Sequence, residues 1–100
     1  MSGQAVSKNG IAIRLTDERW AHITEEHAEL SDFRTSVLET ILHPERILAG
    51  KGGELIAVRQ IEQGKHLAVV YREHKEDGFV ITAFITSKGR SLERRKKLWP

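Results

Sequence analysis

Three segments with the composition of β-strands, joined by turns of hairpin length, fill most of the second half of the chain. Residues Glu54–Ile61, His66–Arg72 and Phe79–Thr86 are rich in branched and aromatic side chains, and the connections between them contain Gly64 or Gly78. Short connections favour antiparallel pairing of consecutive strands. This half of the chain therefore predicts an antiparallel sheet.

Two helices are predicted ahead of these strands. The first begins at the capping candidates Thr16 or Asp17 and extends to about Ala28. The second covers residues 33–42, where apolar side chains recur on one face, and it ends before Pro44.

The order of the segments defines the fold class. A weak strand over Ile11–Leu15, two helices and three or four strands predict an α+β fold, with two N-terminal helices packed on a curved antiparallel sheet of about four strands. Ser91 is expected to cap a short C-terminal helix that ends near Trp99. We expect residues 1–10 to form a flexible tail and residues 11–100 to form a single domain.

The composition excludes several classes of protein. The chain has no cysteine, which rules out a disulfide scaffold, a thiolate nucleophile and a thiolate zinc site, and which fits a reducing cytoplasm. No apolar run approaches the roughly 18 residues of a membrane span, and the polar N-terminus is unlike a signal peptide. We expect a cytoplasmic protein with no membrane partner and no cofactor.

Positive charge is concentrated near the C-terminus. Residues 1–50 hold five basic and eight acidic side chains, whereas residues 51–100 hold eleven basic and six acidic ones. The excess comes from Lys88, Arg90, Arg94, Arg95, Lys96 and Lys97. This asymmetry suggests an anionic partner, and nucleic acid is the first candidate. A solvated basic helix that aids solubility is an equal alternative.

The two faces of the third strand differ in polarity. Alternation places Phe79, Ile81, Ala83 and Ile85 on one face, which we expect to pack on the helices. Val80, Thr82, Phe84 and Thr86 share the other face, which we expect to be concave and partly wet. Matching the apolar faces of neighbouring strands would place Arg72 and His66 beside the two threonines. Threonine is also a strong strand former, so its presence there needs no functional reason.

Two histidines on the first helix are candidates for acid or base chemistry. His22 and His27 are five residues apart, or about 140° around a helix, so both cannot point into one site. This spacing also differs from the four-residue spacing of a helical zinc pair, and we expect no metal site. His27 lies on the apolar stripe, whereas His22 lies with Arg19 and Glu26 on a more exposed face. A structural role for each histidine remains the alternative.

Several short motifs occur in a distinctive order. They are Trp20-Ala-His22-Ile23 with His27, then His43-Pro44-Glu45-Arg46-Ile47, Tyr71-Arg72, the strand Phe79–Thr86, and the basic terminus ending in Leu98-Trp99. Over residues 11–99 the chain resembles the phage-associated branch of the barnase–EndoU–colicin–RelE-like nucleases. The resemblance implies a small metal-independent ribonuclease fold of the kind used by toxins of toxin–antitoxin pairs, with RNA and a cognate antitoxin protein as partners.

The resemblance also implies roles for individual residues. The catalytic candidates are His27, His22, Arg72, Thr82 and Thr86, with His27 the preferred acid or base, Arg72 stabilising the phosphate charge and the threonines donating hydrogen bonds. The candidates for holding RNA are Tyr71, Lys88, Arg90, Arg94 and Arg95.

The sequence departs from the family pattern at two points. Ala28 stands where many relatives have proline, and no glutamate is evident as a base of the barnase kind, so the general base stays open. We therefore carry an alternative from another class, a non-catalytic RNA- or protein-binding module on the same fold. A structural homo-oligomer with Trp99 in its interface is a third possibility.

Overall fold

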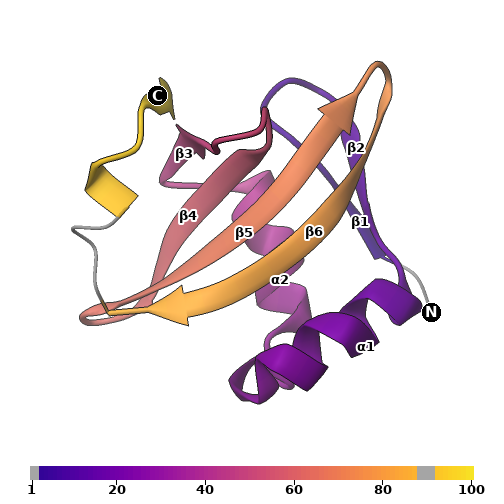
Figure 1. Cartoon of the computed structure of the whole chain (residues 1–100), viewed down its shortest axis with the longest axis vertical. Helices are drawn as coiled ribbons and strands as arrows, with labels where there is room; N and C mark the ends of the chain where they lie inside the picture. The colour runs from indigo at the N-terminus through magenta and orange to yellow at the C-terminus, as the bar shows by residue number, and fades with distance from the viewer. Residues whose placement is uncertain (1–2, 88–91) are drawn as a thin grey trace.

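The computed structural model of the chain describes residues 3–87 and 92–100. Within these residues the strands are β1 (Gly3–Val6), β2 (Ala12–Leu15), β3 (Arg46–Ala49), β4 (Leu55–Glu62), β5 (Lys65–His74), β6 (Asp77–Thr86) and β7 (Lys97–Trp99). The helices are α1 (Asp17–Glu26), the 3₁₀ turn η1 (Ala28–Leu30) and α2 (Arg34–Leu42). The strands form one sheet in the order β1-β2-β6-β5-β4-β3-β7 (Figure 1).

The sheet is mixed rather than antiparallel. Residues 12–14 of β2 run parallel to residues 77–79 of β6, while every other pair of neighbouring strands is antiparallel. The predicted α+β fold with two helices on an antiparallel sheet of about four strands is therefore wrong, because the described residues form a seven-stranded mixed sheet. The parallel pair joins segments more than 60 residues apart, which no local pattern in the sequence reveals.

Both ends of the described chain add a strand that the sequence pattern did not predict. Gly3–Val6 forms β1 on β2, and Ala5 is only 7% exposed, so the predicted flexible tail over residues 1–10 is wrong for this segment. Lys97–Trp99 forms β7 on β3 where the end of a C-terminal helix was predicted. The predicted cap of that helix, Ser91, lies outside the described residues.

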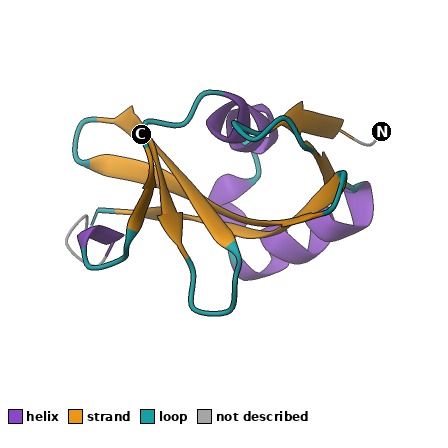
Figure 2. Cartoon of the chain, turned by 90° about the horizontal axis from the view of Figure 1, so that it is seen from above, coloured by secondary structure: helices purple, strands orange, loops and turns teal. Residues whose placement is uncertain are grey.

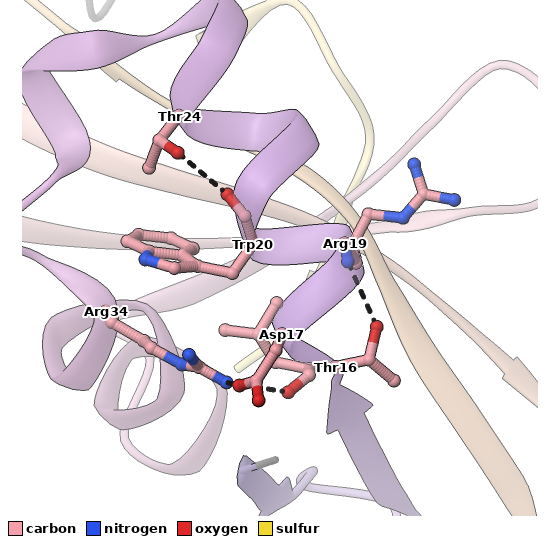
Figure 3. Close-up of polar contacts among 7 residues, drawn as sticks. Thr16, Asp17, Arg19, Trp20, Thr24 and Arg34 are labelled. Carbon is pink, nitrogen blue, oxygen red and sulfur yellow. Dashed lines mark hydrogen bonds and ion pairs between the residues drawn. The ribbon is translucent and has the colours of Figure 1, made fainter. Parts of the chain in front are cut away.

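Helix α1 begins where the sequence predicts. The Thr16 hydroxyl oxygen accepts a hydrogen bond from the backbone N–H of Arg19 at 3.1 Å and so caps the helix (Figure 3). Asp17 in the first turn lies 2.6 Å from Nη2 of Arg34, which links the start of α1 to the start of α2. Neither helix is long and apolar enough to cross a membrane, as far as the described residues show.

The main core lies between the sheet and the two helices, which cover the same face of the sheet (Figure 1). Its largest fully buried side chains include Ile13, Leu15, Leu30, Ile41, Leu67 and Tyr71. These side chains come from η1, α2, β2 and β5, and Ile23 of α1 packs in the same cluster, so burial of apolar area fixes the helices against the sheet.

The sheet curls toward its helical side. Helix α2 contacts β1, β4 and β5, and Nζ of Lys8, in the turn after β1, lies 4.9 Å from the ring centroid of Trp99 in β7. Because β1 and β7 are opposite edges of the sheet, this contact requires the sheet to wrap around α2 (Figure 2). The concave side is therefore filled by helix and core, and the prediction of a wet concave face is wrong. The helix-free face, which we call the outer face, lies on the other side.

A β-bulge at Ile81 changes which side chains of β6 point inward. Tyr71 pairs with Val80 and Val70 pairs with Thr82, so Ile81 is the extra residue. Strict alternation therefore fails at the bulge. Val80 is buried in the core while Phe79, predicted to pack on the helices, is 41% exposed.

A second, smaller core covers part of the outer face. Leu92, from the C-terminal segment, packs there with side chains of β3, β4 and β5. The cluster consists of Leu48, Ile56, Val58, Ala68 and Leu92, with Val70 and Phe84 packed against it. This contact holds the basic C-terminal segment against the outer face.

Candidate functional site

A pocket of about 280 Å³ opens on the outer face beside the second core. Its floor comes from the central strands and its walls come from the β3–β4 turn and the C-terminal segment. The lining residues are Lys51, Glu54, Ile56, Val70, Phe84, Leu92 and Arg95. We call it the outer-face pocket.

Strand register explains the apolar floor. Ile56 of β4 is paired with Val70 of β5, and Phe84 of β6 is paired with Ala68, two residues before Val70. Side chains on paired residues and on every second residue share a face. The floor thus brings together three strands and includes one aromatic ring that is partly accessible.

Glu54 is the acidic residue of this pocket. It stands directly before β4, and the preceding Gly53 has φ +90°, a conformation that favours glycine. The backbone N–H of Gly52 donates to Glu54 Oε1 at 3.0 Å, and Glu54 Oε2 lies 3.3 Å from Arg72 Nη2. Hydrogen bonds from the backbone N–H groups of Gly52 and of Glu54 itself, followed by the positive charge of Arg72, lower the pKa of Glu54 below its ordinary value. The side chain is 21% exposed, so a deprotonated carboxylate faces the pocket and remains reachable.

Arg72 holds the turn that carries Glu54. Its Nη2 group donates to the carbonyl oxygen of Gly52 at 3.0 Å as well as to Glu54. The side chain is 39% exposed, and a guanidinium carries five N–H donors, so these contacts leave donors for a ligand. Arg72, a predicted catalytic residue, therefore directly contacts the lining of the outer-face pocket.

Two cations line the same pocket as this carboxylate. Lys51 comes from the β3–β4 turn, and Arg95 comes from the C-terminal segment predicted to hold RNA. Arg94, also predicted to hold RNA, lines a neighbouring hollow together with Arg95. The outer-face pocket thus combines a carboxylate, positive charge and an aromatic floor.

His22 and Thr82, both predicted to be catalytic, meet at a different place. They line a hollow of about 210 Å³ between α1 and β6, together with Arg19, Ile23, Glu26 and Ile81. Nδ1 of His22 lies 3.9 Å from Glu25 Oε2, and its side chain is exposed. This hollow, the α1–β6 hollow, brings an imidazole and a hydroxyl together without Arg72.

The remaining predicted site residues are dispersed. His27 ends α1, is half-buried, and has its Nδ1 3.7 Å from Glu29 Oε2, so it does not join Arg72 and Thr82 in one cleft. Thr86 on β6 is paired with His66 on β5, as the matching of apolar faces predicted, but Arg72 is paired with Phe79 and not with Thr82, so that half of the prediction is wrong. Lys88 and Arg90 lie outside the described residues.

Tyr71 is placed where it cannot contact RNA. Its side chain is 0% exposed in the main core, so the predicted role in holding substrate is wrong for this structure. The reason is strand parity. Tyr71 follows Leu67 and Val69 on the inward face of β5, whereas Arg72 points to the outer face.

Sequence reasoning missed Glu54 and Lys51. Both belong to a short turn, and nothing in the sequence says that this turn lies beside the C-terminal cations. The sequence did hold one signal for Glu54. This residue follows Gly52-Gly53 and precedes a strand, and a turn at such a place can project a side chain over the sheet.

Comparisons of the chain with models of protein families, with curated proteins and with solved structures found no match. Across residues 3–87 and 92–100, no three His, Asp or Glu side chains gather in a group that could hold a metal ion.

Proposed function

We propose that this protein is a metal-independent endoribonuclease that binds single-stranded RNA at the outer-face pocket. The observation that carries the proposal is the Glu54–Arg72 ion pair, which presents a deprotonated carboxylate beside the cations Lys51 and Arg95. Cleavage of RNA without a metal needs a base, an acid and positive charge near the phosphate, and this pocket holds a group suited to each role.

The proposed reaction uses the 2′-hydroxyl of RNA as nucleophile. The Glu54 carboxylate takes the hydroxyl proton, and the 2′-oxygen attacks the adjacent phosphorus. The bond to the 5′-oxygen of the next nucleotide breaks and a 2′,3′-cyclic phosphate forms. The Lys51 ammonium gives a proton to the leaving oxygen, while Arg95 and Arg72 balance the charge that builds up on the phosphate.

Phe84 supplies a surface for a base. Single-stranded RNA is commonly bound by stacking unpaired bases on aromatic rings, and the ring of Phe84 lines the pocket beside Ile56 and Val70. This assigns to Phe84 the stacking role that Tyr71 cannot take from within the core.

The proposal assigns the base to Glu54 instead of His27. His27 faces Glu29 at the end of α1, away from the cations of the outer-face pocket. The α1–β6 hollow with His22 and Thr82 is a competing site for the same chemistry, and variants can separate the two.

Cleavage of a labelled RNA in the presence of EDTA tests the proposal. We expect Glu54→Gln to reduce the rate about 100- to 10,000-fold, the range typical of losing one acid or base. Glu76→Gln, a change of the same kind in the exposed β5–β6 turn, should leave the rate unchanged. Full activity in Glu54→Gln contradicts the proposal, and loss of activity in His22→Ala alone transfers the site to the α1–β6 hollow.

A second candidate function is RNA binding without cleavage. It is favoured by the contacts of Arg72, whose bonds to Gly52 and Glu54 also serve to anchor the turn. Salt-sensitive RNA binding with no cleavage products in the wild type would support this candidate.

As a cytoplasmic toxin, the enzyme would act on cellular RNA and would be held inactive by a cognate antitoxin protein. Induced expression of the wild type alone should then stop growth, and Glu54→Gln should relieve the arrest.

A further inference from the structure

A second hollow, of about 500 Å³, lies next to the outer-face pocket and carries a different charge pattern. Its lining consists of Ala49, Gly50, Lys51, Arg94, Arg95 and Lys96, four cations and no carboxylate. We call it the cationic hollow. Lys51 and Arg95 line both places, so the cationic hollow and the outer-face pocket adjoin.

The walls of the cationic hollow are held together by the backbone. The N–H of Ala49 donates to the carbonyl oxygen of Lys96 at 2.8 Å, which joins the end of β3 to the segment before β7. The N–H of Gly50 donates to the carbonyl oxygen of Glu54 at 2.8 Å, which closes the β3–β4 turn. The cations therefore project from two tied segments rather than from a free terminus.

The cations of the cationic hollow have no ion-pair partner within the described residues. None of its four cations forms an ion pair with a described carboxylate, whereas Arg14 pairs with Asp77 and Arg34 pairs with Asp17, both at 2.6 Å. Like charges held close together repel and raise the local potential, so such a cluster attracts an anion of high charge.

We propose that the cationic hollow binds the terminal phosphate of a 5′-phosphorylated RNA strand. A terminal phosphate carries about two negative charges near neutral pH, against one for each backbone phosphodiester, and it offers three oxygens to guanidinium and ammonium donors. Four cations that line one hollow suit the terminal group better than a passing backbone phosphate. The proposal rests on the proposed function for the identity of the polymer.

The shared lining gives this binding a consequence for the substrate. A strand whose terminal phosphate occupies the cationic hollow places its first nucleotides along Lys51 and Arg95 toward Phe84 and Glu54. RNA with a 5′-phosphate would thus be cut close to that end. The same strand with a 5′-hydroxyl would bind without a fixed position of its first nucleotides.

Binding measured on strands that cannot be cut separates this inference from the activity. RNA with 2′-O-methyl groups lacks the nucleophile, so fluorescence anisotropy of a 3′-labelled strand reports binding alone. With the wild-type protein we expect the 5′-phosphorylated strand to bind about tenfold more tightly than the 5′-hydroxyl strand, which is about 1.4 kcal/mol. Arg94→Ala and Lys96→Ala should remove this difference. Lys65→Ala, which removes a cation paired with Glu62 in the β4–β5 hairpin, should retain it.

Competition identifies the source of the phosphate. Pyrophosphate and a nucleoside diphosphate serve as probes, and we expect each to compete only at concentrations well above those of the phosphorylated strand. A nucleoside diphosphate that binds more tightly than the strand overturns the inference in favour of a free nucleotide. Equal affinity for the two strands, or a preference that survives both Arg94→Ala and Lys96→Ala, also overturns it. Failure to cleave unmodified RNA would contradict the proposed function alone.

Discussion

Oε2 of Glu54 lies 3.3 Å from Nη2 of Arg72, so a residue of the β3–β4 turn is joined to the middle strand of the outer face. The same Arg72 group also donates a hydrogen bond to the carbonyl oxygen of Gly52, which ties the turn at a second point. One guanidinium thus both shapes the turn and keeps its carboxylate charged. The two effects can be separated by titration.

The acid limb of the pH–rate profile should report Glu54. Because the Gly52 hydrogen bond and Arg72 lower the pKa of Glu54, the base form persists below pH 4.5 and the limb should lie below that value. Arg72→Gln removes one of these causes, so the limb should move to higher pH. Initial rates of RNA cleavage in EDTA from pH 3 to pH 8 measure the shift.

Arg59→Gln serves as the matched control. Arg59 also lies in the sheet, on β4, but its side chain points to the helical face and not to the outer face that carries Arg72. It should leave the acid limb in place. An acid limb above pH 4.5 in the wild type would contradict a catalytic carboxylate at Glu54, and an equal limb in the wild type and in Arg72→Gln would contradict the contribution of Arg72 to its pKa.

Replacing Tyr71 by phenylalanine should stabilise the protein. The Tyr71 hydroxyl is buried and has no hydrogen-bond partner among the described residues, and an unsatisfied buried polar group costs about 1–3 kcal/mol. Urea unfolding at pH 7 should therefore show Tyr71→Phe to be more stable by about 1 kcal/mol. A variant that is less stable than the wild type by a similar amount would mean that the hydroxyl has a partner.

The same substitution should change the response to alkali. Burial, and then the charge of Glu73, raise the pKa of Tyr71 above 10. The unfolded chain releases this proton near pH 10 while the folded chain retains it, so wild-type stability should fall as the pH rises above 10. Tyr71→Phe should lack this part of the decline. Tyr71 is the single tyrosine of the sequence, so tyrosinate absorbance follows this group directly.

The local parts of the fold could be predicted from the sequence, and the non-local parts could not. Thr16 identified the start of α1, and the segments around Val58, Val69 and Ala83 were recognised as strands because each has a local pattern. The parallel pairing of β2 with β6 has no local signature. Nor does the bulge at Ile81, which reversed the predicted faces of Phe79 and Val80.

The site follows the same division. Arg72 and Arg95 were recognised as candidates because strand parity and charge runs are visible in the sequence. Glu54 and Lys51 were not recognised, because their role depends on the turn meeting a C-terminal segment some 40 residues away. His27 matched a motif, yet the end of α1 directs it toward Glu29.

Strand β1 should contribute substantially to stability even though it has only four residues. Ala5 lies in the main core, paired with Ile13, while its neighbour Gln4 is exposed. Ala5→Glu would bury a charge and should destabilise the protein by about 3 kcal/mol or more. Gln4→Glu adds the same charge on the outside and should change stability by less than about 0.5 kcal/mol in urea unfolding. Similar effects for the two variants would contradict the placement of β1.

Contact between the two edges of the sheet should depend on the charge of Lys8. Its Nζ lies 4.9 Å from the Trp99 ring centroid, and exposed cation–π pairs contribute about 0.5–1 kcal/mol. Lys8→Met keeps most of the side chain but removes the charge, so it should lower the free energy of unfolding by about that amount, whereas Lys8→Arg should retain it. Urea unfolding of the three proteins in parallel measures the difference. In a Trp99→Ala background the contact is absent, so Lys8→Met should have no further effect, and an effect that persists there would assign the stabilisation to some other contact of Lys8.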